Sequence, residues 1–218
     1  MVALSLIMAT TLDSIGLHAG PYPVGVAVTM PLENRNRLTT ALRPILAVPH
    51  AVLVGPAAWV RPFGAAGLLG SAAYVLAIVN WFSLLIGGAD LKGVRDFQLY
   101  YLRWRTRALA YMALFADAYP PFGDGPYPVS IEVADPPATR DRATIAVRPL
   151  LAVPHLVVLC FILIAWFVTT VIAWFAIMFT GSYPTALSTF AVGAMRWMLR
   201  VEAYLLLLVD EYPPFALD

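Results

Sequence analysis

Two long stretches without a charged residue constrain the fold of this chain more than any other feature. Asp, Glu, Lys and Arg are absent from Pro149 to Met195 and from Pro62 to Ala89. A transmembrane helix needs about 20 apolar residues to cross roughly 30 Å of hydrocarbon, and each stretch is longer than that. Charged residues make up 12% of the chain, whereas a soluble domain carries about 25%. The sequence therefore predicts an integral membrane protein.

The remaining composition excludes several classes of protein. The net charge of +1 argues against a nucleic-acid partner, because nucleic-acid-binding domains carry a strongly basic patch or stripe. A single cysteine, Cys160, rules out an internal disulfide. The apolar start of the chain has no basic region before it and is interrupted by Asp13. We therefore expect residues 1–21 to form a short disordered or interfacial leader rather than a cleaved signal.

An internal repeat organises the rest of the chain. The block RPILAVPH at Arg43–His50 recurs 105 residues later as RPLLAVPH at Arg148–His155, with one residue changed. Chance does not produce such a match. Later motifs match at an offset of 93 residues: Trp81-Phe82 with Trp174-Phe175, Arg103-Trp104 with Arg196-Trp197, and Tyr119-Pro120-Pro121-Phe122 with Tyr212-Pro213-Pro214-Phe215.

The change of offset locates an insertion. Because the offset falls from 105 to 93, the first copy carries 12 extra residues between His50 and Trp81. The predicted organisation has three parts: the leader at 1–21, repeat 1 with its 12-residue insertion at 22–123, and repeat 2 at 124–218.

Each copy shows the same order of expected elements. Alternating apolar residues at Val24–Val28 and Val129–Val133 predict short β-strands. The proline-containing block then predicts a kinked interfacial segment, because proline breaks or kinks an apolar helix. Two helices joined by a short loop follow as an antiparallel hairpin. They are expected at Gly67–Ile86 and Phe97–Ala116 in the first copy, and at Leu156–Phe179 and Leu187–Val209 in the second. The predicted class is an all-α integral membrane protein of two tandem repeats.

The second helix of each hairpin carries the candidate binding residues, because the positions shared by the two copies form one helical stripe. An arginine at the bilayer centre costs at least about 2.5 kcal/mol. Three explanations stay open: pairing with Asp117, Asp210 or Glu202, snorkelling to lipid phosphates, and a specific site for an anionic lipid or a partner. The candidates are Arg103, Trp104, Arg107, Tyr111 and Asp117 in the first copy, and Arg196, Trp197, Arg200, Tyr204 and Asp210 in the second.

Two further pairs of residues occupy equivalent positions in the two copies and are expected at the membrane interface: Arg43 with Arg148, and His50 with His155. A twofold axis could bring the histidines together as metal ligands or proton carriers. A four-ligand site needs two more donors, however, and no HExxH, His-rich or Cys-rich spacing occurs. We therefore expect interfacial histidines, with no metal and no cofactor. The Tyr-Pro-Pro-Phe motifs are expected to end helices beside the membrane.

The topology of the helices depends on whether the second helix of each hairpin spans the membrane. Arginines and lysines lie on both sides of the first helix, so the charge bias gives no clear orientation. If all four helices span, the two repeats are parallel. If the second helices lie in the interface, only two helices cross and the repeats are inverted. We expect four crossing helices.

These motifs resemble an uncharacterised bacterial membrane-protein family, a domain of unknown function. The resemblance covers nearly all of Tyr127 to Leu217, and more loosely Tyr22 to Phe122. It implies a tandem two-copy, multi-pass protein of the bacterial inner membrane, but no activity. The residues that carry it are RPLLAVPH at Arg148–His155, the span end at Val171–Gly181, the RWxxRxxxY motif at Arg196–Tyr204, and the YPPF motif at Tyr212–Phe215.

The first copy departs from the second at Asp90 and Lys92, where the second copy has Tyr183 and Thr185. This difference is typical of a partner-facing or specialised half. No nucleotide loop, GxSxG motif or catalytic set is present, so no enzyme is expected.

The leading hypothesis is a non-enzymatic accessory or scaffolding subunit of a larger bacterial membrane complex. Its expected partners are membrane lipids and other membrane-protein subunits. The alternative is a small lipid-binding or lipid-transport protein whose symmetric arginine stripes line a site between the repeats.

Overall fold

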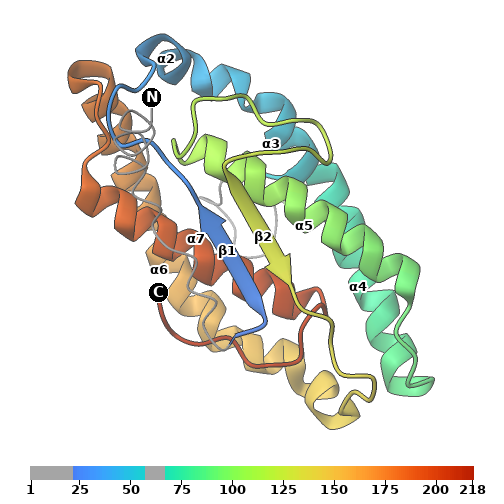
Figure 1. The fold of residues 1–218 in the computed structure, drawn as a ribbon. Coiled ribbons are helices and arrows are strands. Elements are labelled where there is room, and N and C mark those ends of the chain that lie inside the picture. The colour runs from blue at the N-terminus through green and yellow to red at the C-terminus, as the bar shows by residue number, and fades with distance from the viewer. Residues whose placement is uncertain (1–21, 57–66) are drawn as a thin grey trace, which may run out of the picture.

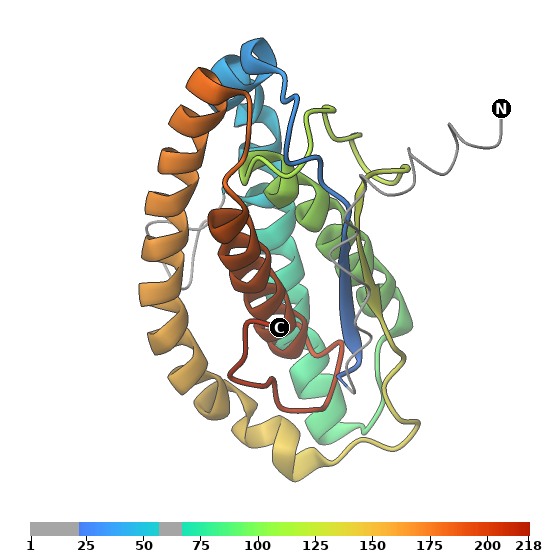
Figure 2. The ribbon, with the colours of Figure 1, turned by 60° about the vertical axis from the view of Figure 1, so that its left-hand side comes forward.

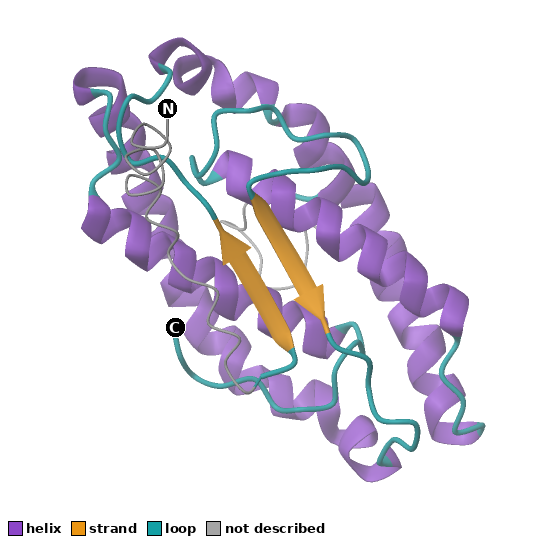
Figure 3. Cartoon of the chain, viewed as in Figure 1, coloured by secondary structure: helices purple, strands orange, loops and turns teal. Residues whose placement is uncertain are grey.

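The computed structural model of this chain describes residues 22–56 and 67–218. The expected leader and part of the insertion lie outside the described residues. Within them, the fold is mostly helical with a small sheet (Figure 3). The elements are β1 (Val24–Val28), α2 (Arg37–Leu46), α3 (Val48–Val54), α4 (Gly67–Ile86), α5 (Lys92–Met112), β2 (Val129–Val133), α6 (Arg142–Thr180) and α7 (Thr185–Leu205).

The two predicted strands are confirmed, and they pair with each other. β1 and β2 are antiparallel, with Val26 opposite Ile131 at the centre of the ladder. All the valines and isoleucines of the two strands except the partly buried Val133 are buried, with β1 packed against α7 and β2 against α5, while Ser130 and Glu132 point outward and are exposed. The alternation in the sequence therefore corresponds to one buried and one open face of the sheet.

The helices form two further layers. α5 and α7 lie in the middle and are largely buried, with β2 and α4 both packed against α5. Figure 2 shows the sheet on one side of α7 and the long helix α6 on the other. The outer layer consists of α2, α3, α4 and α6. A layer of protein lies on each side of the central helices, so most of their side chains are buried, although Arg103 on α5 is exposed.

The long outer helices α4 and α6 run in opposite directions (Figures 1 and 2). The end of α4 contacts the start of α6, where Trp81 Nε1 donates a hydrogen bond to the Ile145 carbonyl. This differs from the expected four-helix arrangement, in which these helices are parallel. Two helices, Gly67–Gly87 and Arg142–Thr180, are long and apolar enough to cross a membrane.

The prolines do not interrupt the second half as predicted. α6 continues through Pro149 and Pro154 as one curved helix (Figure 2). Proline lacks the amide that would bond the carbonyl four residues earlier. For Pro149 that carbonyl belongs to Ile145, and it accepts a hydrogen bond from Trp81 Nε1 at 2.8 Å instead. A donor from the other half of the chain thus replaces the missing amide.

The same replacement occurs in the first half. The carbonyl left free by Pro44 belongs to Thr40, and it accepts a hydrogen bond from Trp174 Nε1 at 2.8 Å. Here the helix is divided, since α2 ends at Leu46 and α3 begins at Val48. Each half therefore contributes a tryptophan that completes the proline-containing helix of the other half.

The insertion interrupts a helix that is continuous in the second half. α3 ends at Val54 and α4 begins at Gly67, and the two offsets place these residues opposite neighbouring positions 159 and 160 of α6. Gly67 has a φ of 65°, and a side chain there would clash with the backbone of Leu53 and Gly55. The two ends of the interruption therefore meet, and the 12 extra residues are 55–66.

Trp81→Phe is expected to destabilise the fold by about 1–3 kcal/mol, because it leaves the buried carbonyl of Ile145 without a donor. The cost should be smaller in a Pro149→Ala background, where the helix amide can bond that carbonyl again. Unfolding of the four proteins of this cycle, purified in mild detergent, measures the difference. Equal costs in the two backgrounds would show that Trp81 contributes only packing.

Candidate functional site

Both central helices end in a left-handed turn formed by a leucine. The φ angle is 68° at Leu114 and 62° at Leu207. At the end of α5, the amides of Leu114 and Phe115 donate to the carbonyls of Tyr111 and Ala110. This is a Schellman turn, which usually places glycine at the left-handed position. A side chain there costs about 1–3 kcal/mol, so other contacts must hold the turn.

These turns end the helices earlier than the sequence predicted. α5 ends at Met112 rather than Ala116, and α7 ends at Leu205 rather than Val209. The apolar residues that follow each turn continue the helical pattern but belong to the loop. Asp117 and Asp210 therefore lie beyond the helices and not on the predicted stripe.

An arginine from the outer layer caps each turn. In the first half, Arg43 on α2 donates to the Tyr111 carbonyl at 3.2 Å and to Asp117 at 2.9 Å. Its guanidinium carbon lies 4.6 Å from the centre of the Tyr111 ring. A cation is favourable at a helix C-terminus, where the carbonyls carry partial negative charge, and also over an aromatic ring.

A second arginine completes this network. Arg35 binds Asp117 through Nε and Nη2, at 3.1 and 2.6 Å, and the backbone amide of Asn36 donates to the same carboxylate. Burial raises the pKa of Asp117, but the hydrogen bonds from Arg35 and Asn36 outweigh it, so the pKa lies below its usual value. Asp117 is therefore ionised and balances two buried arginines.

The second half repeats these contacts. Arg148 on α6 donates to the Tyr204 carbonyl at 3.1 Å and to Asp210 at 2.7 Å, and its guanidinium carbon lies 4.5 Å from the centre of the Tyr204 ring. Arg140 forms an ion pair with Asp210, as Arg35 does with Asp117. The sequence showed these residues as matching positions, but not that they contact one another.

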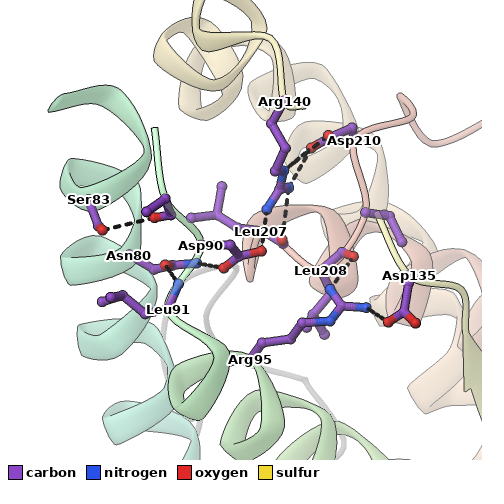
Figure 4. A network of polar contacts seen from close by, with 12 residues as sticks. Asn80, Ser83, Asp90, Leu91, Arg95, Asp135, Arg140, Leu207, Leu208 and Asp210 are labelled. Atoms are coloured by element: carbon purple, nitrogen blue, oxygen red, sulfur yellow. Dashed lines mark hydrogen bonds and ion pairs between the residues drawn. The ribbon is translucent and has the colours of Figure 1, made fainter. Parts of the chain in front are cut away.

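The second network contains an additional carboxylate, shown in Figure 4. Asp90, in the loop between α4 and α5, accepts from Arg140 at 3.0 Å and from the Asn80 amide at 2.8 Å. Asn80 also accepts the backbone amide of Leu91 at 2.9 Å. The equivalent of Asp90 in the other half is Tyr183. The departure at Asp90 therefore gives the Arg140 network one more negative charge than the Arg35 network.

The two histidines are buried in separate aromatic enclosures. His50 stacks on Phe122 with ring centroids 4.5 Å apart, contacts Tyr119, and accepts a hydrogen bond from Trp104 Nε1 at 3.0 Å. Burial lowers the pKa of His50, and the nearby carbonyl of Pro120 opposes this only in part. A neutral ring that accepts at Nδ1 carries its proton on Nε2.

His155 has the equivalent surroundings in the second half. It stacks on Phe215 at 3.9 Å and accepts from Trp197 Nε1 at 3.1 Å. Each Tyr-Pro-Pro-Phe motif thus covers the histidine of its own half, in addition to following a helix end. The structure does not bring the histidines together. In the part of the chain that it describes, no three His, Cys, Asp or Glu residues could hold a metal ion.

The arginines of the predicted stripe have other partners than the expected aspartates. Arg107 donates to the carbonyl of Gly123 and to Asp124. Arg103 is exposed. Pairing of this stripe with Asp117 was one of the three open explanations, and the structure does not show it: α5 ends before that residue, and the carboxylate pairs with Arg35 and Arg43 instead.

In the second half the stripe lies beside β1 and the segment before it. Arg196 donates from Nε to the Val26 carbonyl at 3.3 Å. Arg200 is 9% exposed, and its guanidinium carbon lies 5.9 Å from the centre of the Tyr22 ring. These contacts have no counterpart at Arg103 and Arg107, so the two stripes are not equivalent in space.

A family model described as "Domain of unknown function (DUF4389)" matches residues 37–123 and 142–216. The chain belongs to this family. The two matched segments begin 105 residues apart and end 93 residues apart, which are the offsets that relate the sequence motifs. No curated protein and no solved structure matches the chain.

One buried ion pair joins the two DUF4389 segments. Arg105 on α5 donates to Glu202 on α7 at 2.8 Å, and Tyr101 donates to the other carboxylate oxygen at 2.9 Å. Arg105 also donates to the Val54 carbonyl at 2.6 Å, where α3 is interrupted. Arg105 was not among the residues predicted from the sequence, because its equivalent in the second segment is Met198. A signal was present, since Arg105 and Glu202 carry opposite charges and match the uncharged residues Met198 and Leu109 in the other DUF4389 segment.

Proposed function

We propose that this DUF4389 protein is an accessory or scaffolding subunit of a larger membrane complex in the bacterial inner membrane, and not an enzyme. The observation that carries the proposal is the division between its polar and apolar residues. The polar side chains that match between the two halves are mostly engaged inside the protein, where they hold turns and helix ends. The outer layer, by contrast, exposes apolar side chains over its whole length.

The exposed apolar surface supports contact with lipid or with helices of other subunits. On α6, Phe161 is 69% exposed and Ile164 is 51% exposed, and on α4 the exposed fraction of Val75 is 61%. Soluble proteins rarely expose apolar patches larger than a few hundred Å². A multi-pass placement of this layer requires α4 and α6 to cross the bilayer in opposite directions.

The buried charges support a structural role for the matching motifs. Arg43 and Arg148 cap helix ends, and Asp117 and Asp210 neutralise them. The equivalent contacts of the two halves also support the interpretation of the chain as two tandem copies. A framework braced in this way is suited to holding partner helices in fixed positions.

The alternative, lipid binding by symmetric arginine stripes, rests on a single exposed position. Arg103 is open to an anionic head group, but Arg196 and Arg200, at the equivalents of Arg103 and Arg107, lie beside β1 and Tyr22. A site formed jointly by the two stripes therefore has less support than the accessory role.

Purification in mild detergent tests the two functions. We expect other membrane-protein subunits to co-purify in fixed stoichiometry. A Phe161→Ala/Phe175→Ala variant should lose them, since both side chains are exposed on α6, whereas Glu132→Gln on the sheet should retain them. Recovery of the chain alone with tightly bound phospholipid would contradict the accessory role. Loss of that phospholipid in Arg103→Gln would then favour the alternative.

A further inference from the structure

The apolar surface of α6 is longer than a bilayer is thick. It extends from Val147, which is 46% exposed, to Phe179, which is 77% exposed. This segment is about 50 Å long at 1.5 Å per residue, whereas the hydrocarbon core measures about 30 Å. At the average tilt of about 20°, a crossing helix covers only about 32 Å of its length in hydrocarbon. A crossing α6 would therefore leave much apolar surface in water.

The opposite side of the protein is unsuited to hydrocarbon. Glu132 and Ser130 are exposed on the outer face of β2. The sheet has two strands among the described residues, so each strand has an edge without a partner strand. Arg196 donates to the Val26 carbonyl of β1, but lipid cannot satisfy the remaining backbone groups of an open edge. An acidic side chain at mid-bilayer costs roughly 2.5–3.5 kcal/mol.

The position of the polar sheet limits how the protein can be oriented relative to the membrane. In the view of Figure 1 its strands lie about midway along the long helices and run along the same diagonal, and Figure 2 shows the sheet on the side of the protein opposite α6. If α4 and α6 crossed the bilayer, the sheet would lie beside them at mid-depth. Glu132 would then face hydrocarbon. If the layer lies flat on the membrane instead, the sheet is on the water side.

Exposed arginines lie at both ends of the outer layer. Arg142, at the start of α6, lies beside Gly88 after the end of α4, and Arg37, at the start of α2, lies beside Gly181 after the end of α6. In a flat orientation both guanidinium groups reach the phosphates of one leaflet. In a crossing orientation they lie on opposite sides, and the positive charge gives no preferred direction.

We propose that the outward faces of α2, α3, α4 and α6 are immersed in a single leaflet, with these helices lying along the membrane plane and the sheet facing water. This surface thus contacts the acyl chains and phosphates of one leaflet, and the partner helices of the proposed complex lie in that same leaflet. The inference rests on the proposed membrane location, but it replaces a multi-pass arrangement by a one-sided one.

Single cysteines in the full chain test this orientation. In a Cys160→Ser background, Ala89→Cys marks the end of α4, Thr185→Cys follows the end of α6, and Ser130→Cys marks the sheet; all three positions are exposed. A membrane-impermeant maleimide is applied to spheroplasts and to inverted vesicles. We expect the maleimide to label all three cysteines in the same one of the two preparations and none of them in the other. Phe161→Cys, within the apolar layer, should resist labelling in both preparations.

The flat orientation and the membrane location can be refuted separately. Labelling of Ala89→Cys and Thr185→Cys from opposite sides would show that the helices cross, and would refute the flat orientation while leaving the membrane location in place. Release of the wild-type chain from membranes by alkaline carbonate would refute the membrane location itself, and with it the proposed function.

Discussion

Glu202→Gln is expected to lower the free energy of unfolding by about 3–5 kcal/mol, because it leaves a buried arginine without its counter-ion. The side chains of Arg105 and Glu202 are 8% and 6% exposed. Water therefore cannot solvate the guanidinium once the carboxylate is removed. Reversible unfolding of the purified protein in mild detergent measures the loss.

Two further variants control this result. Asp135 also pairs with an arginine, but its side chain is 92% exposed, so Asp135→Asn should cost less than about 0.5 kcal/mol. Arg105→Met/Glu202→Leu should recover most of the loss, because apolar residues can replace a buried ion pair at little cost. If Glu202→Gln is as mild as Asp135→Asn, the pair does not hold the halves together.

The Arg105–Glu202 pair explains how an interrupted helix can be tolerated. The insertion ends α3 at Val54 and leaves the last carbonyls of that helix without amide partners. Arg105 donates to the carbonyl of Val54 while Glu202 balances its charge. The interruption occurs in one half alone, and the ion pair that supports it is likewise confined to one pair of positions. The interruption after Val54 and the Arg105–Glu202 ion pair are thus two linked departures from the correspondence between the halves.

Local patterns were sufficient to predict the elements whose form depends on neighbouring residues in the chain. The strand at Val129–Val133 alternates buried and exposed residues, and the predicted bounds agree with the structure. The first long helix was also predicted correctly, at Gly67–Ile86. Alternation of apolar residues predicts the strand, and the length of an uninterrupted apolar stretch predicts the helix.

Features that depend on distant residues were not predictable in this way. α6 passes through Pro149 because Trp81, from the other half, bonds the freed carbonyl. The turn after α5 has Leu114 at a position where glycine is the usual signal, and Arg43 on α2 supports it. The repeat showed that these residues correspond between halves. It could not show which of them contact each other, because contacts within and between halves leave the same sequence pattern.

The two aspartate networks differ in charge, and this difference predicts unequal effects of the same substitution. Asp117→Asn leaves Arg35 and Arg43 buried, with side chains 0% and 2% exposed and no ion pair to a second carboxylate among the described residues. The expected loss is about 3 kcal/mol, at the low end of the usual range because the Asp117 side chain is 25% exposed. Asp210→Asn should cost less, because Arg140 retains its ion pair with Asp90.

The loss of unfolding free energy in these variants should also depend on Asp90 and on pH. Adding Asp90→Asn to Asp210→Asn should raise the cost to that of Asp117→Asn, whereas additive small losses would show that Asp90 does not compensate.

The lowered pKa of Asp117 stabilises the fold fully above the unfolded value of about 3.9, and this stabilisation disappears as the pH falls through the folded value. The difference in unfolding free energy between wild type and Asp117→Asn should therefore be constant near neutral pH and shrink below about pH 4. A difference that persisted unchanged in acid would mean that packing, and not the charge of Asp117, holds the turn.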